Sequence, residues 1–291
     1  MYGGESSAAY RVPHVYGIVH QHVNCIPTPP VPRAVTARLP DRPEQRLPAL
    51  DLDEHLDDPA IKQHFVTTMF EVIAPRYDRF TRVFSYGMDR GWKRRLLAEL
   101  PAGGTHPLIV DLACGTGDLA ALSAATLPAA TVVGLDIAPR MIRNAAAVAR
   151  RSGTGRVRFA VGDMTRLPLP DASADVVTVG YGVRNAPTPA AAIAEIARVL
   201  RPGGLLLTLD FYRPPHALWR RLFLAYLRAA GNLVGWLWHG VPVAYGYIAP
   251  SVARYLTCEE YTAALRALGF EVTRVDRILL GGIGLHVARR T

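Results

Sequence analysis

Short apolar runs alternate with helix-like segments through most of the chain, and this rhythm limits the fold more than any other feature. The seven runs expected as strands are residues 107–113, 131–137, 157–163, 175–182, 205–211, 271–280 and 282–290. Helices are expected after Gly117, over 139–151, from Pro189 and over 257–270. Strands that alternate with helices predict an α/β fold with a mostly parallel sheet and helices on both faces.

Two further helices are expected before the first strand, and each opens on an aspartate. Asp58 and Asp89 are the expected N-caps, and Pro59 occupies the first helical position of the earlier helix. Near the other end of the chain, Thr257 and Glu260 have the spacing of a capping box. These signals place helix starts at residues 58, 89 and 257.

A glycine-containing turn follows the first expected strand, within the stretch VDLACGTGD. Gly115 and Gly117 let the backbone turn tightly at a helix N-terminus, where free N–H groups favour a negatively charged ligand group. A dinucleotide fingerprint needs a third glycine three residues after Gly117, and that position is Ala120. The turn therefore indicates a ligand site without indicating a dinucleotide.

Three aspartates lie at or near the ends of successive strands around this turn. Asp111 precedes the turn, Asp136 ends the second strand, and Asp163 ends the third beside Met164. Ligands of such sheets bind beyond the carboxyl ends of the strands. There Asp136 can accept hydrogen bonds from a ribose diol, and Asp163 can accept one from an adenine amino group. One such acid alone is usually a cap or a surface group, but three together indicate a nucleoside site.

Composition limits the class of protein and its partners. The chain has 291 residues, half of them hydrophobic, and a formal net charge of +9. The positive charge is almost all scattered arginine, with Lys62 and Lys93 the only lysines, so nucleic-acid binding is not expected. Three widely spaced cysteines fit a reduced compartment. The sequence therefore predicts a cytoplasmic protein with no disulfide framework.

The first 57 residues are rich in proline and are expected to form a disordered extension, with the folded domain over 58–291. His20, His22 and Cys25 lie in this extension without a second ligand cluster, so no metal site is expected. The most apolar later segment, 218–238, contains three arginines, which argues against a transmembrane helix.

The fourth expected strand ends unusually, because Arg184 and Asn185 follow its apolar run. Gly180 and Gly182 are expected to leave room there for a flat ring or a methyl donor, and Thr188 is expected to cap the next helix. The alternative for Arg184 is an ordinary loop arginine paired with a helix carboxylate such as Glu195. From these residues alone the loop arginine is the favoured interpretation, and a catalytic role for the pair stays an alternative.

Several motifs together resemble the class I S-adenosylmethionine-dependent methyltransferases, namely VDLACGTGD, GLDIAPRMI, GDMTRLPLPDASADVV and EIARVLRPGGLLLTLDF. The stretches APRYDRFTRVFSYGMDRGWKRRLL and GYGVRNAPTPAAAIAEIARVLRPGG, with the terminal GGIGLHVARR, are similar to the ubiquinone and menaquinone biosynthesis C-methyltransferases. This second resemblance extends over nearly the whole chain after residue 60.

The resemblance implies a Rossmann-like fold with a helical cover and S-adenosylmethionine as the cofactor. The residues implied to bind the cofactor are Asp111, Gly115, Thr116, Gly117, Asp136, Ile137, Asp163 and Met164. The implied substrate is a polyprenylated quinol, most simply demethylmenaquinol or its benzoquinol counterpart. A homodimer and peripheral contact with the inner face of the membrane are compatible with this substrate.

Methyl transfer to an aromatic carbon needs an oriented quinol, exclusion of water, and stabilisation of the charge that develops on a ring oxygen. Arg184 is the expected source of positive charge, with Asn185 and Tyr77 as hydrogen-bonding partners of the substrate. Three alternatives remain open. They are a methyltransferase acting on another phenolic small molecule, a nicotinamide-dependent oxidoreductase, and a quinone-binding protein without catalysis.

The segment 211–256 is expected to form a substrate cover with a groove for the prenyl tail, although a helix that simply packs on the sheet is equally compatible. Cys114 is expected to be a small buried residue, and His286 to lie outside the site. The chain also departs from the family pattern. Asp89 stands where members commonly have histidine, Asp210 where they have glutamate, and Gly246 where they have arginine.

Overall fold

The computed structural model describes residues 58–101, 106–151, 156–239 and 243–291. The expected disordered extension, with His20, His22 and Cys25, lies outside these described residues.

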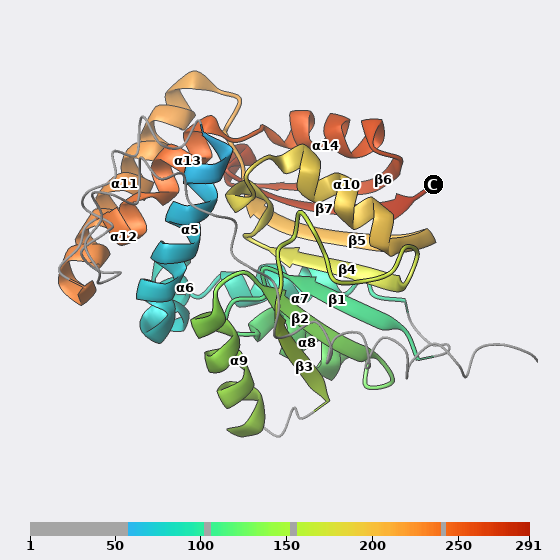
Figure 1. The fold of residues 1–291 in the computed structure, drawn as a ribbon. Coiled ribbons are helices and arrows are strands. Elements are labelled where there is room, and N and C mark those ends of the chain that lie inside the picture. Colours follow the sequence, from blue (N-terminus) through green and yellow to red (C-terminus); the bar gives the residue numbers. More distant parts are fainter. Residues whose placement is uncertain (1–57, 102–105, 152–155, 240–242) are drawn as a thin grey trace, which may run out of the picture.

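A seven-stranded sheet forms the centre of the described chain, as expected (Figure 1). Its strands are β1 Leu108–Leu112, β2 Thr131–Asp136, β3 Val157–Val161, β4 Ala174–Gly180, β5 Leu200–Phe211, β6 Phe270–Ile278 and β7 Ile283–Arg290. The order across the sheet is β3-β2-β1-β4-β5-β7-β6, with β7 antiparallel to both of its neighbours and all other pairs parallel. The chain order reverses between β1 and β4, and ligands of doubly wound sheets bind at such a point.

Helices cover both faces of this sheet. They are α7 Asp89–Leu97, α8 Asp118–Thr126, α9 Pro139–Arg151, α10 Pro189–Val199 and α14 Cys258–Ala267. On one face, α10 packs beside β5 and α14 on β6 and β7, and their apolar residues belong to one core with alternate residues of β1, β2 and β4. On the other face, α7 and α8 pack on the intervening residues of the same strands. The alternation along each strand therefore supplies two cores, one per face.

A group of helices from two distant parts of the sequence gathers at one end of the sheet (Figure 1). Its members are α5 Pro59–Ile73, η2 Ala74–Arg76, α6 Tyr77–Phe84, α11 Ala217–His239, α12 Val243–Gly246 and α13 Ile248–Arg254. These helices share a third apolar core, in which Phe65 of α5 contacts Tyr247, and Phe80 of α6 stacks on Tyr245. We call this group the helical cover.

Glycines allow α11 and α12 to approach closely within the cover. A Cβ atom at Gly231 would lie 2.6 Å from the backbone oxygen of Tyr245, and one at Gly246 would collide with the side chain of Asn232. The close approach of α11 and α12 therefore depends on the absence of a side chain at residues 231 and 246.

Two of the four expected helix caps form as predicted. The Asp58 carboxylate accepts hydrogen bonds from the backbone N–H groups of residues 60 and 61, and Thr257 forms a complete capping box with Glu260. Thr188 occupies the N-cap position of α10, but its side chain makes no capping hydrogen bond. The prediction for Asp89 was wrong, because Met88 is the N-cap and Asp89 is the first residue of α7. Its carboxylate instead accepts a hydrogen bond from the hydroxyl of Tyr181.

The two glycines at the end of β4 have different roles. Gly180 lines a cavity beyond the strand end, as expected. Gly182 does not line it, and a Cβ atom there would lie 2.6 Å from Cβ of Ala113 and 2.9 Å from Val179. The missing side chain at residue 182 therefore allows the ends of β1 and β4 to pack closely rather than leaving room for a ligand.

Candidate active site

Two cavities meet beyond the carboxyl ends of β1 and β4, beneath the helical cover. The larger has a volume of about 310 Å³ and the smaller about 50 Å³. Three aromatic residues, Phe70, Tyr77 and Tyr181, line both cavities. A molecule in one cavity and a molecule in the other would therefore face each other across this aromatic junction.

The smaller cavity is lined mainly by apolar residues and contains two acidic side chains. Asp136 and Asp163 are the charged residues that line it, and none of the described lining residues is a lysine or arginine. Gly115, Ile137 and Met164 also line it, which agrees with their expected place around a cofactor. A site with two carboxylates and no cation suits a ligand with hydroxyl, amino or cationic groups and does not suit a pyrophosphate.

Asp136 ties the glycine turn to the end of β2. Its carboxylate accepts hydrogen bonds from the backbone N–H groups of Gly115, at 2.9 Å, and Ala138, at 2.9 Å. Burial raises the pKa of Asp136 to about 6, although these two hydrogen bonds oppose the rise. The side chain therefore both shapes the glycine turn and presents a carboxylate to the cavity.

Asp163 is held by its own turn and by the cover. One carboxylate oxygen accepts from the backbone N–H and the hydroxyl of Thr165, and the other accepts from the Gln63 amide at 2.5 Å. Gln63 also lines the smaller cavity. It was not among the residues expected from the sequence, because its side chain reaches the site only when α5 packs across the end of the sheet.

Asp111 lies beneath the cavity rather than in its wall. The residue is fully buried, its Oδ1 accepts from the Thr178 hydroxyl at 2.7 Å, and its Oδ2 has no hydrogen-bonding partner in the described chain. Burial raises the pKa of Asp111 to about 7, despite the hydrogen bond from Thr178. Thr116 and Gly117 also lie outside the lining of the cavity. An unpartnered buried carboxylate oxygen below the glycine turn fits a cationic amino group of a ligand such as S-adenosylmethionine.

Arg184 enters the larger cavity from η3, Val183–Asn185, directly after β4. Its Nη1 donates to Asp210 Oδ1 at 2.9 Å and to the backbone oxygen of Tyr181 at 2.6 Å, while its Nε has no partner in the described chain. The alternative pairing with Glu195 does not form, because Glu195 binds Arg198 and the backbone N–H of residue 167. Arg184 is therefore a buried, oriented cation directly after the end of β4.

Asn185 points in a different direction from Arg184. Its amide donates to the Tyr181 backbone oxygen at 3.1 Å, and its side-chain oxygen accepts from the Tyr247 hydroxyl at 3.3 Å. Asn185 lines the smaller cavity, whereas Arg184 lines the larger one. The pair that is adjacent in sequence thus divides between the two cavities.

Tyr77 lies at the junction, where the sequence placed a substrate-binding tyrosine. Its ring meets Phe70 edge-on, with the ring centroids 5.9 Å apart, and it lies against Gly115 of the cofactor turn. Burial raises the pKa of Tyr77 to about 12, with Arg184 and Lys93 opposing the rise. Its phenol therefore stays protonated at neutral pH and can act as a hydrogen-bond donor.

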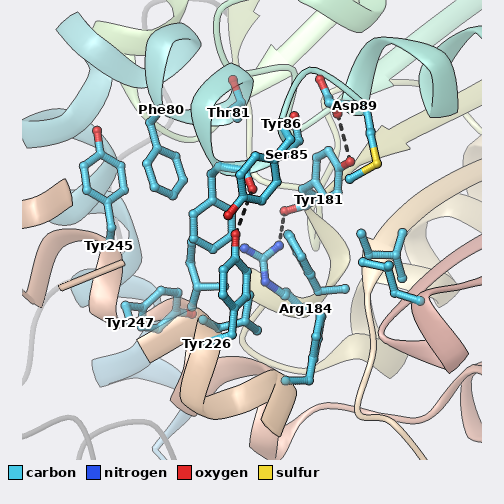
Figure 2. A pocket seen from close by; sticks show the side chains of 18 of the residues that line it. Phe80, Thr81, Ser85, Tyr86, Asp89, Tyr181, Arg184, Tyr226, Tyr245 and Tyr247 are labelled. Carbon is cyan, nitrogen blue, oxygen red and sulfur yellow. Dashed lines mark hydrogen bonds between the residues drawn. The ribbon is translucent and has the colours of Figure 1, made fainter. Parts of the chain in front are cut away.

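The larger cavity is walled mainly by apolar and aromatic side chains of the cover (Figure 2). Helix α11 contributes Trp219, Leu222, Phe223, Tyr226 and Leu227 to its wall. Figure 2 shows that Arg184 and Tyr181 lie at the polar side of this space, with the rings of Phe80 and Tyr245 on the opposite side.

Both lysines of the chain lie beside the site, Lys62 half-buried and Lys93 buried. Lys62 donates to the backbone oxygen of Ala186 at 2.6 Å, and Lys93 binds Asp89 and Asp118. Burial lowers the pKa of Lys62 to about 8. Only two of the 33 basic residues are lysines, and this rarity is the sequence signal that could have identified these two positions.

The sequence predicted no part in the reaction for His286 and Cys114. His286 is buried against Tyr212 and Thr262, away from both cavities, and burial lowers its pKa to about 4. Burial raises the pKa of the Cys114 thiol well above its ordinary value. No group of residues in the described chain could hold a metal ion. None of the described helices is long and apolar enough to cross a membrane.

Comparisons with known proteins agree with this geometry. The model of the ubiE/COQ5 methyltransferase family matches residues 59–290. The demethylmenaquinone methyltransferase of Thermus thermophilus is 39% identical over 225 residues, which are 76% of this chain and 100% of that protein. The ubiquinone/menaquinone biosynthesis C-methyltransferase UbiE of Rubrivivax gelatinosus is 38% identical over 79% of this chain and 88% of its own.

Among solved structures, the geranyl diphosphate C-methyltransferase of Streptomyces coelicolor has a similar fold. Its TM-score is 0.52 at 14% identity, over 69% of this chain and 76% of that chain. At this identity the likeness concerns the fold alone.

Proposed function

The chain belongs to the ubiE/COQ5 methyltransferase family, and from this membership we propose that it transfers a methyl group to a ring carbon of a polyprenylated quinol. It is an S-adenosylmethionine-dependent methyltransferase. Demethylmenaquinol is the proposed substrate, since the relatives compared above carry that name or the combined ubiquinone and menaquinone name. These names favour a quinol over another phenolic molecule.

The observation that carries this proposal is the meeting of two unlike cavities at one aromatic junction. The acidic cavity suits the nucleoside and amino-acid parts of S-adenosylmethionine, which supplies a methyl group already activated on a sulfonium. The apolar cavity suits a flat ring with a hydrocarbon tail. Phe70, Tyr77 and Tyr181 border both, so the methyl group and the ring carbon would approach each other between them.

The residues of the chain contribute orientation and charge stabilisation. Asp136 and Asp163 hold the ribose and adenine in the proposed site, and Asp111 attracts the amino group from below. Positioning of two reactants can lower a barrier by about 7–11 kcal/mol. Arg184, which is buried and paired with Asp210, stabilises the phenolate that forms when a quinol hydroxyl loses its proton, and the ring carbon attacks the methyl group from this electron-rich form. The proton on the methylated ring carbon then leaves to water, which restores the aromatic ring. Tyr77 donates a hydrogen bond at the junction, and Asn185 fixes the loop through Tyr181 and Tyr247.

The nicotinamide alternative is disfavoured by the acidic cavity. A dinucleotide pyrophosphate needs N–H donors or cations around its phosphates. The described lining instead presents Asp136 and Asp163. Titration with a nicotinamide dinucleotide should therefore show no binding under conditions where S-adenosylhomocysteine binds.

The cover is proposed to hold the prenyl tail and to contact the membrane from which the substrate comes. Leu222 and Tyr226 of α11 line the cavity and are also exposed at the surface, so the cavity wall continues into the surface of the helix. The same exposed stripe includes Leu218, Leu233, Trp236 and Leu237. The described helix contains arginines but no acidic residue. Apolar stripes with basic neighbours bind anionic bilayer surfaces.

Vesicle sedimentation tests this membrane contact. The wild-type protein should sediment with vesicles of phosphatidylethanolamine and phosphatidylglycerol, and the double variant Leu233→Glu/Trp236→Glu should remain in solution. If the wild-type protein ignores the vesicles and size-exclusion chromatography shows a dimer that the double variant loses, the stripe is instead a homodimer interface.

A substrate panel tests the proposed reaction. Purified protein is incubated anaerobically with S-adenosylmethionine and a naphthoquinol, a benzoquinol, their untailed forms and simple phenols, and products are identified by mass. We expect a singly methylated product from the tailed naphthoquinol and less from its untailed form. Preferential methylation of a simple phenol would contradict the assigned substrate class.

A further inference from the structure

Two charged side chains of opposite sign reach the otherwise mainly apolar larger cavity. Arg184 comes from the end of β4, and Asp89 comes from the first turn of α7. Tyr181 lies between them. Its hydroxyl donates to Asp89 Oδ1 at 2.8 Å, and its backbone oxygen accepts from Arg184 Nη1 at 2.6 Å (Figure 2). Tyr181 thus lies between the guanidinium of Arg184 and the carboxylate of Asp89 and contacts both.

Asp89 is paired with a buried lysine. Its Oδ2 lies 2.8 Å from Lys93 Nζ, and Lys93 also binds Asp118 at 2.9 Å. Burial disfavours the charge of Lys93, but the attraction of Asp118 and Asp89 outweighs it and raises the pKa of Lys93. Two carboxylates share one ammonium, so the trio keeps a net negative charge. Asp89 is also the first residue of α7, where the positive end of the helix dipole favours a negative side chain.

The Asp89 carboxylate also retains unused acceptor capacity. A carboxylate offers about four lone-pair positions. The Tyr181 hydroxyl uses one position on Oδ1, and Lys93 uses one on Oδ2. Because Asp89 lines the cavity, a hydroxyl group of a bound ligand can donate to a remaining position.

The reduced and oxidised forms of a quinone differ in what they can offer to such a group. A quinol carries two hydroxyl groups on opposite sides of its ring, and each can donate a hydrogen bond. A quinone carries two carbonyl groups that can only accept. A guanidinium can serve either form, whereas a carboxylate attracts a hydroxyl group and repels a carbonyl oxygen.

We propose that Asp89 is a specificity-determining residue that selects the reduced ring. It accepts a hydrogen bond from the quinol hydroxyl farther from Arg184 and excludes the quinone through repulsion between oxygen lone pairs. This inference rests on the proposed quinol methyl transfer. The selection matters because only the electron-rich quinol can attack the methyl donor, and a bound quinone would block the cavity without reacting.

Two substitutions separate the charge of Asp89 from its hydrogen bond to Tyr181. Asp89→Asn keeps an oxygen that can accept from Tyr181 but removes the charge and adds an amide donor. Tyr181→Phe removes the hydrogen bond but keeps the charge. Asp171→Asn is the matched control, because the Asp171 side chain is 79% exposed and pairs with Arg198 away from the cavities.

The measurement is the ratio of the dissociation constants of a short-tailed demethylated naphthoquinone and its quinol. It is made by anaerobic equilibrium dialysis with saturating S-adenosylhomocysteine. Wild-type protein, Tyr181→Phe and Asp171→Asn should each bind the quinol about tenfold more tightly than the quinone, or better. In Asp89→Asn this preference should fall about tenfold, because the amide can donate to a quinone carbonyl.

An unchanged preference in an Asp89→Asn variant that still binds S-adenosylhomocysteine would overturn the inference. If that variant no longer binds S-adenosylhomocysteine, the test rests on the wild-type protein alone. Equal affinity of the wild-type protein for the quinol and the quinone would then overturn the inference. A wild-type protein that methylates the quinol but binds both forms alike refutes only the role of Asp89. A protein that binds S-adenosylhomocysteine and methylates no quinol refutes the proposed function instead.

Discussion

At the scale of single residues, Asp111 and Asp136 are buried carboxylates whose desolvation outweighs the hydrogen bonds that they accept and, for Asp111, the attraction of Lys93. Burial raises the pKa of Asp111 to about 7 and that of Asp136 to about 6. The folded pKa values lie above the ordinary value for aspartate, so these two carboxylates bind more protons in the folded than in the unfolded chain between about pH 4 and pH 7. A ligand with a cationic amino group instead favours the ionised carboxylates.

The pH dependence of the ligand-free protein follows with a definite sign. The contribution of Asp111 and Asp136 to the free energy of unfolding should fall as the pH rises from about 4 to 7, at about 1 kcal/mol per pH unit for each group, and then level off. His286, whose pKa burial lowers to about 4, contributes in the opposite direction between about pH 4 and 6.5, so the contribution of Asp111 is isolated as the difference between wild type and Asp111→Asn. Urea denaturation at a series of pH values measures this. In Asp111→Asn the upper part of the decline, near pH 7, should disappear. A stability difference between wild type and Asp111→Asn that does not change over the same interval would contradict the assignment.

The affinity for the cofactor should change in the opposite direction. Calorimetric titration with S-adenosylhomocysteine should show binding that tightens between about pH 5 and pH 8, because the ligand favours ionised Asp111 and Asp136. Asp111→Asn should bind more weakly at pH 8 and show a flatter profile. Equal affinity of this variant and the wild type at pH 8 would remove Asp111 from the binding site.

Arg184 is predicted to act on the reaction rather than on cofactor binding. In Arg184→Ala we expect kcat to fall by about 10²–10³, because the charge on the quinol oxygen loses its stabilising donor. The affinity for S-adenosylhomocysteine should stay within a few-fold. Arg184→Lys should recover part of the activity, since it restores the charge without the planar fork.

The control for this experiment is Arg201→Ala, which removes an exposed arginine of β5 that pairs with Asp175 of β4. Its activity should equal that of the wild type. Full activity in Arg184→Ala would exclude Arg184 from the mechanism.

At the scale of helices and strands, most starts and ends could be predicted because local chemistry determines them. Asp58, Pro59 and the Thr257 capping box each mark a helix start within the few residues around them. Asp89 was misassigned because its role depends on Tyr181, which is 92 residues away in sequence. From sequence, a carboxylate beside a helix start is predicted to be a cap. In the folded protein a distant hydroxyl and a lysine bind it instead.

The two threonine caps provide a matched stability test. Thr257→Ala removes a hydrogen bond of 3.1 Å to the backbone of Glu260 and should lower the free energy of unfolding by about 1 kcal/mol. Thr188→Ala removes no capping hydrogen bond and should cost clearly less. Urea denaturation of both variants measures the difference, and a larger loss in Thr188→Ala would contradict the assignment of the caps.

At the scale of the whole molecule, the sequence identified the acidic strand ends but not the junction between the cavities. The acids could be predicted because parallel strands bring their carboxyl ends to one edge. Phe70 and Gln63 could not, because they reach that edge only after α5 packs against α12 and across the sheet. The wall of the larger cavity likewise combines α6 with α11, which are more than 130 residues apart in sequence.

The central claim is that these two cavities bring a methyl donor to a ring carbon rather than to a ring oxygen. It is tested most directly with a tailed demethylnaphthoquinol that carries deuterium at the ring carbon to be methylated. Transfer to carbon must expel that deuterium, so the account predicts a methylated product that has lost the label. A methylated product that retains the deuterium would show transfer to oxygen and contradict the account.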